Sequence, residues 1–204
     1  MKAFTYLLGM FVLLLGFSPQ SVAAPPKVDC VLSADRATYH INQTAHLSVR
    51  IINKSAHDVY LLGSLDGSEE GRRFPKWRVE VLDAAGKPVN MKRGGAWCGN
   101  MNTLRPDDFV LVPRGGSFNP FGQGFFGADG FEFLHVQRPG RYRVRFVYST
   151  ASDAIRDYFG DERMRSQFQP SPDIMHLFRQ VPKVELRSNE LRLEFTAPNA
   201  KVQN

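Results

Sequence analysis

The chain has 204 residues with a formal net charge of +6, and 43% of its residues are hydrophobic. This composition excludes a disordered chain, and the length is sufficient for one domain with a substantial core. Because the positive charge is modest and spread along the sequence, it permits an acidic partner but does not indicate nucleic acid binding.

Residues 1–23 are expected to be a secretory signal peptide. Lys2 supplies a positive charge, and residues 4–17 form an apolar run shorter than the roughly 20 residues of a membrane span. Residues 21–23 (SVA) place small side chains where signal peptidase cuts. The residues before Cys30 do not fit a lipoprotein signal. We therefore expect a periplasmic or secreted mature chain, residues 24–204, without a lipid anchor or a transmembrane span.

The sequence contains two cysteines, Cys30 and Cys98. An even number of cysteines in an exported protein predicts that they form a disulfide. Such a bridge would stabilise the fold by about 4 kcal/mol, because it restricts the unfolded chain. The alternatives are a metal site or a catalytic thiol, but a second cysteine or a histidine at ligand spacing is missing.

The first half of the mature chain is rich in strand patterns. In residues 45–52 apolar side chains occupy every second position, with Leu47, Val49 and Ile51 on one face, which is typical of a half-buried strand. Turn residues follow most of the strands, so this region is predicted to be a β-meander. Its expected strands are residues 28–32, 45–52, 57–62, 77–82 and 88–91.

The second half continues the strand pattern, with two interruptions. Residues 114–130 are rich in glycine and phenylalanine, and residues 152–182 are expected to be a partly helical insertion before the last strand, with a short helix at 153–159. Short strands separated by Gly, Pro and Asn turns predict an all-β, antiparallel sandwich. The further expected strands are residues 109–112, 131–136, 142–148 and 191–195.

The sequence around these strands resembles immunoglobulin-like modules of exported bacterial proteins. Residues 37–55, together with 58–61 (DVYL), resemble the opening of the intracellular proteinase inhibitor family and of macroglobulin-type domains. Residues 139–144 (PGRYRV) resemble the segment near the end of such sandwiches where a tyrosine fixes the corner, and residues 186–191 resemble the last strand. The resemblance implies an immunoglobulin-like fold for residues 24–204 but supplies no residue of an inhibitory site.

The usual catalytic and metal-binding spacings do not occur in the sequence. Asp153, Asp157, Asp161 and Glu162 are spaced so that some could share a helical face, but interleaved arginines favour a solvated surface. No catalytic residue, metal or cofactor is therefore predicted. The histidines are dispersed, at His40, His46, His57, His135 and His176.

Residues 66–71 (DGSEEG) form an acidic stretch whose carboxylates could hold calcium. Its carboxylates, those of Asp66, Glu69 and Glu70, lack the ligand spacing of known calcium loops. The segment is instead expected to be the polar tip of a hairpin.

The glycine-rich segment supplies the first candidate binding surface, which consists of Phe118, Phe121, Phe125 and Phe126. Rigid rings on an adaptable backbone suit the recognition of apolar or sugar faces. The alternative is that the rings fold inward and cap the core, where each would contribute about 2 kcal/mol.

Residues 141–146 (RYRVRF) supply the second candidate surface. Strand geometry directs the aromatic and aliphatic side chains inward and the guanidinium groups outward, where arginine binds carboxylates, phosphates or sulfates. The alternative is an ordinary exposed strand face with Glu185 or Glu194 opposite. The arginines of this row are Arg141, Arg143 and Arg145.

We therefore expect an exported, non-enzymatic protein that binds another protein, in the cell envelope or outside the cell, through residues 114–130 and 152–182. One rival hypothesis is a carbohydrate-binding module of the envelope, which would need an exposed platform of Trp77, Trp97 and the phenylalanines. The other rival is a hydrolase with an unrecognised site.

Overall fold

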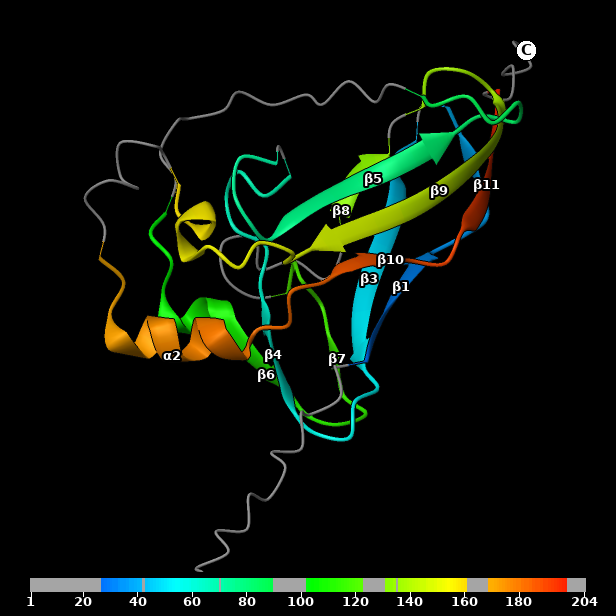
Figure 1. Cartoon of the computed structure of the whole chain (residues 1–204). Coiled ribbons are helices and arrows are strands. Elements are labelled where there is room, and N and C mark those ends of the chain that lie inside the picture. Colours follow the sequence, from blue (N-terminus) through cyan, green and yellow to red (C-terminus); the bar gives the residue numbers. More distant parts are fainter. Residues whose placement is uncertain are drawn as a thin grey trace, which may run out of the picture.

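The structure is a computed structural model that describes residues 27–41, 43–69, 71–89, 102–122, 131–134, 136–160 and 169–197. Within these ranges the chain forms eleven strands, one α-helix and two short 3-10 helices, and most strand pairings are antiparallel (Figure 1). None of the helices in the described ranges is long and apolar enough to cross a membrane. The protein is therefore mostly β, as the sequence predicts.

A first sheet is built around β3 (Ala45–Asn53). β3 pairs with β1 (Val28–Ala34) on one side and with β7 (Ser117–Phe118) and β8 (Phe131–Leu134) on the other, all antiparallel. The alternation in β3 is confirmed, because Leu47, Val49 and Ile51 are all buried.

A second sheet is built around β9 (Gly140–Ser149). β5 (Lys76–Leu82) follows one side of β9, while β10 (Glu185–Arg187) and β11 (Leu191–Thr196) pair with successive parts of its other side. β2 (Thr38–His40) completes the sheet and runs parallel to β11.

The inward side chains of the two sheets form one hydrophobic core. β1 and β3 contribute to it from the first sheet, and β5, β9 and β11 from the second. Because burial of apolar surface is the main favourable term in folding, this shared core holds the two sheets together. Its buried aromatic members are Tyr39, Trp77, Phe118, Phe121, Tyr142, Phe146, Tyr148 and Phe195.

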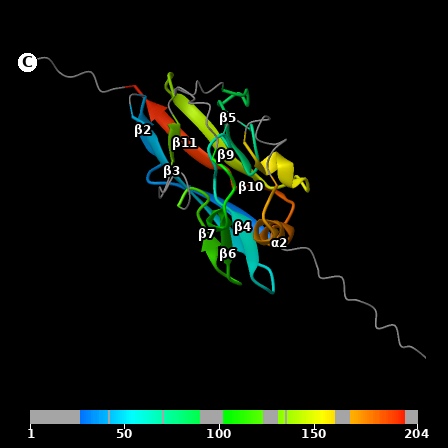
Figure 2. The same cartoon turned by 90° about the vertical axis from the view of Figure 1, so that its left-hand side faces the viewer.

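A second, smaller core lies beside the two-stranded sheet of β4 (Val59–Leu62) and β6 (Phe109–Val112). The helical segments η1 (Pro106–Asp108), η2 (Ile155–Tyr158) and α2 (Pro172–Gln180) gather there. Figure 2 shows α2 and the β4–β6 pair at the opposite end of the molecule from β2 and β11. The buried residues are Leu62, Leu65, Leu104, Phe109, Tyr158, Phe159, Ile174, Phe178 and Val181.

Residues 152–182 contain η2 and α2, so helical structure occurs in this segment as expected. α2 begins after Ser171, whose hydroxyl accepts a hydrogen bond from the backbone N–H of Ile174. Pro172 at the first helical position has no N–H to leave unpaired, which favours a helix start at this point.

Of the β-meander predicted for residues 28–91, the pairing of the first two expected strands is confirmed, because β1 pairs with β3, and the rest is wrong. β3, β4 and β5 belong to three different sheets, and β4 and β5 pair with β6 and β9 instead. A turn sequence permits a hairpin but does not require one, and here each of these two strands buries its apolar face against a partner that is distant in sequence. Of the expected strand at 88–91, Pro88 forms an isolated bridge with Leu82, and residues 90 and 91 lie outside the described residues.

The expected polar hairpin tip at residues 66–71 is also wrong, because much of this connection is buried. Arg73, whose side chain has no exposed surface, forms an ion pair with Asp66. Its Nε donates to the backbone oxygen of Asp66 at 2.9 Å, and an Asp66 carboxylate oxygen accepts from the N–H of Asn102 at 2.9 Å. Burial lowers the pKa of Arg73, but these partners satisfy its charge. Glu70 lies outside the described residues.

Cys30 lies on β1 and is buried in the shared core. Burial raises the pKa of its thiol to about 12. The structure holds Cys30 as a free thiol, and Cys98 lies outside the described residues. The Cys30–Cys98 disulfide therefore stays a prediction.

The disulfide can be tested on protein recovered from the periplasm of an expressing bacterium. If Cys30 and Cys98 are paired, iodoacetamide should add no mass to the protein denatured without reductant, and should alkylate both cysteines after reduction. Mass spectrometry of the intact protein measures both outcomes. Alkylation of both thiols before reduction would contradict the pairing.

Phe178 provides a test of the second core. Its ring lies 5.0 Å from the ring of Tyr158, so Phe178→Ala should leave a cavity between α2 and η2 and lower the free energy of unfolding by about 3–5 kcal/mol. Arg179→Ala changes the next, exposed residue and should cost less than about 0.5 kcal/mol. Urea unfolding measures both variants. Equal stability of the two would show that α2 does not depend on this core.

Candidate functional site

The phenylalanine-rich segment turns its first two rings inward. Phe118 and Phe121 are 4% and 1% exposed and belong to the shared core. Asn119 helps to direct the chain, because its side-chain oxygen accepts a hydrogen bond from the N–H of Phe121 at 2.9 Å. The hypothesis that Phe118 and Phe121 form a binding surface is therefore corrected. Phe125 and Phe126 lie outside the described residues.

A carbohydrate-binding module would need an exposed aromatic platform, and Trp77, like Phe118 and Phe121, is buried and does not contribute to one. Trp77 is 4% exposed, and its ring lies 4.9 Å from that of Phe121 and 5.8 Å from that of Phe146. The indole N–H of Trp77 donates to Ser64 Oγ at 2.8 Å, which satisfies its buried polar atom. Trp97 lies outside the described residues.

The described part of residues 152–182 is fixed by internal contacts. The hydroxyl of Tyr158 donates to the backbone oxygens of Thr150 at 2.8 Å and Ser152 at 3.0 Å. Just beyond the segment, Lys183 Nζ lies 3.5 Å from the ring centroid of Phe178, and burial lowers its pKa to about 8. These residues pack α2 and η2 onto the second core, where the side chains of Tyr158, Ile174 and Phe178 are buried.

The acidic residues of the same segment do not form a described site. Asp157 accepts a hydrogen bond from Ser152 Oγ at 2.6 Å, and Asp161 and Glu162 lie outside the described residues. Over the ranges that the structure describes, no group of three or more His, Cys, Asp or Glu side chains could hold a metal ion.

The arginine row lies where the alternation predicts. On β9 Tyr142, Val144 and Phe146 are buried, while Arg141 and Arg145 are exposed. Tyr142 also fixes the start of the strand, because its hydroxyl donates to the backbone oxygen of Arg138 at 2.8 Å. The guanidinium groups therefore project from the outer face of the second sheet.

The neighbouring strands place more charge on this outer face. In register, Arg143 lies beside Arg192 of β11, Arg141 beside Glu194, and Arg145 beside Glu80 of β5. We name this surface the arginine face. Its arginines are Arg78, Arg141, Arg143, Arg145, Arg187 and Arg192, and its glutamates are Glu80, Glu185, Glu190 and Glu194.

Glu190 is the acid that contacts the row most closely. It lies between β10 and β11, and its carboxylate is 3.0 Å from Arg145, 3.7 Å from Arg192 and 3.9 Å from Arg143. The sequence suggested Glu185 or Glu194 in this role. Glu194 is the register neighbour of Arg141, and Glu185 lies opposite Ser149 instead.

The sequence pattern predicts that the Arg192 side chain lies on the arginine face, but it does not predict this for Glu190. Residues 191–195 (LRLEF) alternate, which places Arg192 and Glu194 on the outward side. Glu190 precedes the strand in a connection, where no periodicity fixes the direction of a side chain.

Two hollows lie on the arginine face, and Arg143 lines both. The larger has a volume of about 520 Å³ and is lined by Arg141, Arg143 and Arg192 with Glu194 and the apolar residues Ala37, Ala84 and Leu193. The smaller has a volume of about 320 Å³ and is lined by Arg143, Arg145, Glu80 and Glu190 together with the apolar residues Val79, Val81, Leu82, Pro88 and Val89. Both volumes are in the range of small-ligand pockets.

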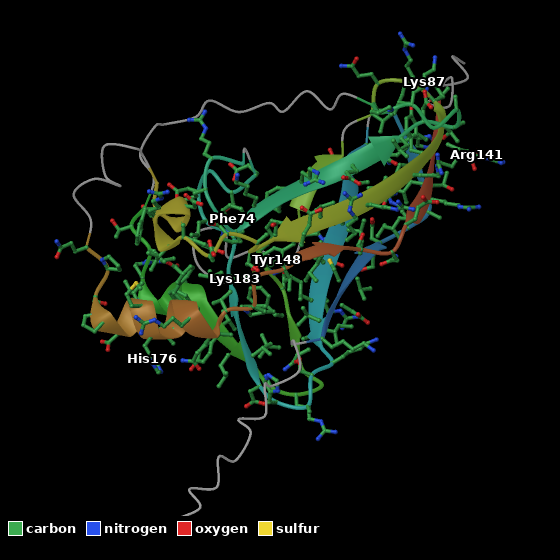
Figure 3. All side chains as sticks on the ribbon, viewed as in Figure 1. Phe74, Lys87, Arg141, Tyr148, His176 and Lys183 are labelled. Carbon is green, nitrogen blue, oxygen red and sulfur yellow. The ribbon has the colours of Figure 1, made fainter. Side chains whose placement is uncertain are left out.

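The turn at residues 83–87 lies close against the guanidinium group of Arg143. Gly86 has a φ of +80°, and a Cβ atom there would lie 3.1 Å from Nη2 of Arg143. Asp83 stabilises the turn, since its carboxylate accepts from the N–H groups of Ala85 and Lys87, each at 2.9 Å. Figure 3 shows Lys87 and Arg141 at the same end of the molecule, far from His176 at the opposite end.

Arginine presents five donors in a planar fork, so this arrangement is suited to binding anionic groups and orienting them. The larger hollow brings together Arg141 and Arg143, which the sequence singled out, and adds Arg192, while Arg145 lines the smaller hollow. No protein-family model matches the chain, and no curated protein sequence matches it.

Proposed function

We propose that this chain is an exported, non-enzymatic binding protein of the cell envelope that holds an acidic segment of another protein on its arginine face. The observation that carries the proposal is the larger hollow, where Arg141, Arg143 and Arg192 converge against one glutamate, Glu194. The signal-peptide pattern of residues 1–23 supports a periplasmic or secreted location.

We further propose that residues 24–204 form an immunoglobulin-like sandwich. Two features support this fold: the core shared by two sheets, and the hydrogen bond from the Tyr142 hydroxyl to the backbone of Arg138, which resembles the tyrosine corner of such domains. The sequence resemblance to intracellular proteinase inhibitors and macroglobulin-type domains points in the same direction.

The charges on the face favour an anionic partner. Among the described residues Arg141 has no ion pair, and a single carboxylate, that of Glu190, is shared by three arginines. Several guanidinium donors therefore stay available to a ligand. Because exposed pairs are screened by salt, we expect weak binding that depends on ionic strength.

The two rival functions have less support within the described ranges. Trp77, Phe118 and Phe121 are buried, so the carbohydrate platform lacks these rings. A hydrolase would need a nucleophile or an acid and base gathered in a cleft, whereas the two hollows are lined mainly by arginine, glutamate and aliphatic side chains.

The proposal can be tested with a fluorescein-labelled oligoglutamate peptide and the full exported protein. Fluorescence anisotropy should show binding that weakens about tenfold in the Arg141→Ala/Arg143→Ala variant, because two exposed charge contacts of about 0.7 kcal/mol each are lost. The matched control is Arg50→Ala/Arg114→Ala, which removes the same charge from exposed positions outside the arginine face and should bind nearly as well as the wild type.

Two results would overturn the proposal. Equal losses in the two double variants would mean that the peptide responds only to net charge. Tighter binding of inorganic polyphosphate than of oligoglutamate, with the same dependence on Arg141 and Arg143, would identify a phosphate polymer as the ligand instead of a protein.

A further inference from the structure

We infer that the acidic partner inserts a carboxylate into the larger hollow, and that Glu190 closes the smaller hollow to anions. This inference rests on the proposed function and deepens it, because it identifies the subsite and the residue that selects it. Its basis is the unequal charge of the two hollows, although Arg143 lines both.

The charges that line each hollow can be compared directly. The larger hollow has three arginines and one glutamate, and it keeps an excess of positive charge even though Glu190 lies 3.9 Å from Arg143 and 3.7 Å from Arg192. In the smaller hollow Arg143 and Arg145 face Glu80 and Glu190, and the charges balance. An anion that approaches the face is therefore attracted to the larger hollow and meets two carboxylates at the smaller one.

Glu190 is held firmly in its position. The backbone N–H of Ser188 donates to the backbone oxygen of Phe146 at 2.9 Å, and the Ser188 hydroxyl accepts from the backbone N–H of Phe146 at 2.9 Å. Asn189 exchanges two hydrogen bonds with the backbone of Leu32 on β1, at 2.8 and 3.0 Å. The connection that carries Glu190 is thus tied to both sheets, and the side chain of Glu190 is only 19% exposed.

The shape and lining of the larger hollow favour an acidic side chain. Ala37 and Ala84 give it exposed apolar surface beside the three guanidinium groups, whereas the Leu193 side chain points into the core. A glutamate can place its methylene groups against such a surface while its carboxylate meets the arginines. A compact inorganic anion would use only the charged part of the hollow.

The two hollows share Arg143, but the arginines at their far sides, Arg141 and Arg145, are far enough apart to act separately in salt. Arg141 and Arg145 are four residues apart on one strand, about 13 Å. The Debye length at physiological ionic strength is about 8 Å, so a charge lost at Arg145 has little direct effect on an anion near Arg141.

The test is a set of single and double variants titrated with oligoglutamate at physiological ionic strength. Arg141→Ala should weaken binding about threefold, while Arg145→Ala should change it less than about twofold. Glu190→Gln should strengthen binding, because it opens the smaller hollow. Adding Arg145→Ala to Glu190→Gln should then weaken binding about threefold, which a double-mutant cycle detects as coupling between the two residues.

The outcomes separate this inference from the proposed function. If the wild type does not bind oligoglutamate, the proposed function itself fails. If the wild type binds but Arg141→Ala and Arg145→Ala weaken binding equally, or Glu190→Gln weakens it, the function stands and the assignment of the larger hollow is wrong. Urea unfolding midpoints close to that of the wild type confirm that each variant is folded.

Discussion

The alternation of β9 is the constraint on which the rest of the structure depends. Tyr142, Val144 and Phe146 enter the core from the same strand that presents Arg141 and Arg145 to solvent. Because side chains of a strand alternate with a period of two, a shift of one residue in register would bury the guanidinium groups and expose the aromatic rings. The pairing of β9 with β5, β10 and β11 thus fixes the core and the arginine face together.

Strands with long alternating patterns were predictable from the sequence, and the shortest ones were not. β3 and β9 have nine and ten residues, enough to show their period, whereas β2, β7 and β10 have two or three. The pairing of β4 with β6 was missed for a different reason. It depends on burial between distant segments, which a local turn pattern does not report.

The candidate site was predictable only in part. The outward direction of Arg141, Arg143 and Arg145 follows from strand geometry, and the structure places these residues as expected. The two hollows and the contact with Glu190 depend on how the β10–β11 connection and the turn at residues 83–87 fold against β9. For the phenylalanines the inward alternative, left open by the sequence, holds for Phe118 and Phe121, because a glycine-rich segment does not reveal which way its rings turn.

Chemical-shift mapping of the full chain by NMR, with oligoglutamate added stepwise, tests the central claim most directly. If the arginine face is the working surface, the perturbed amides should cluster in residues 140–143 of β9, 192–194 of β11 and 83–87 of the turn, which surround the larger hollow. Perturbations centred on α2 and β6, at the opposite end of the molecule, or a spectrum that does not change, would contradict it.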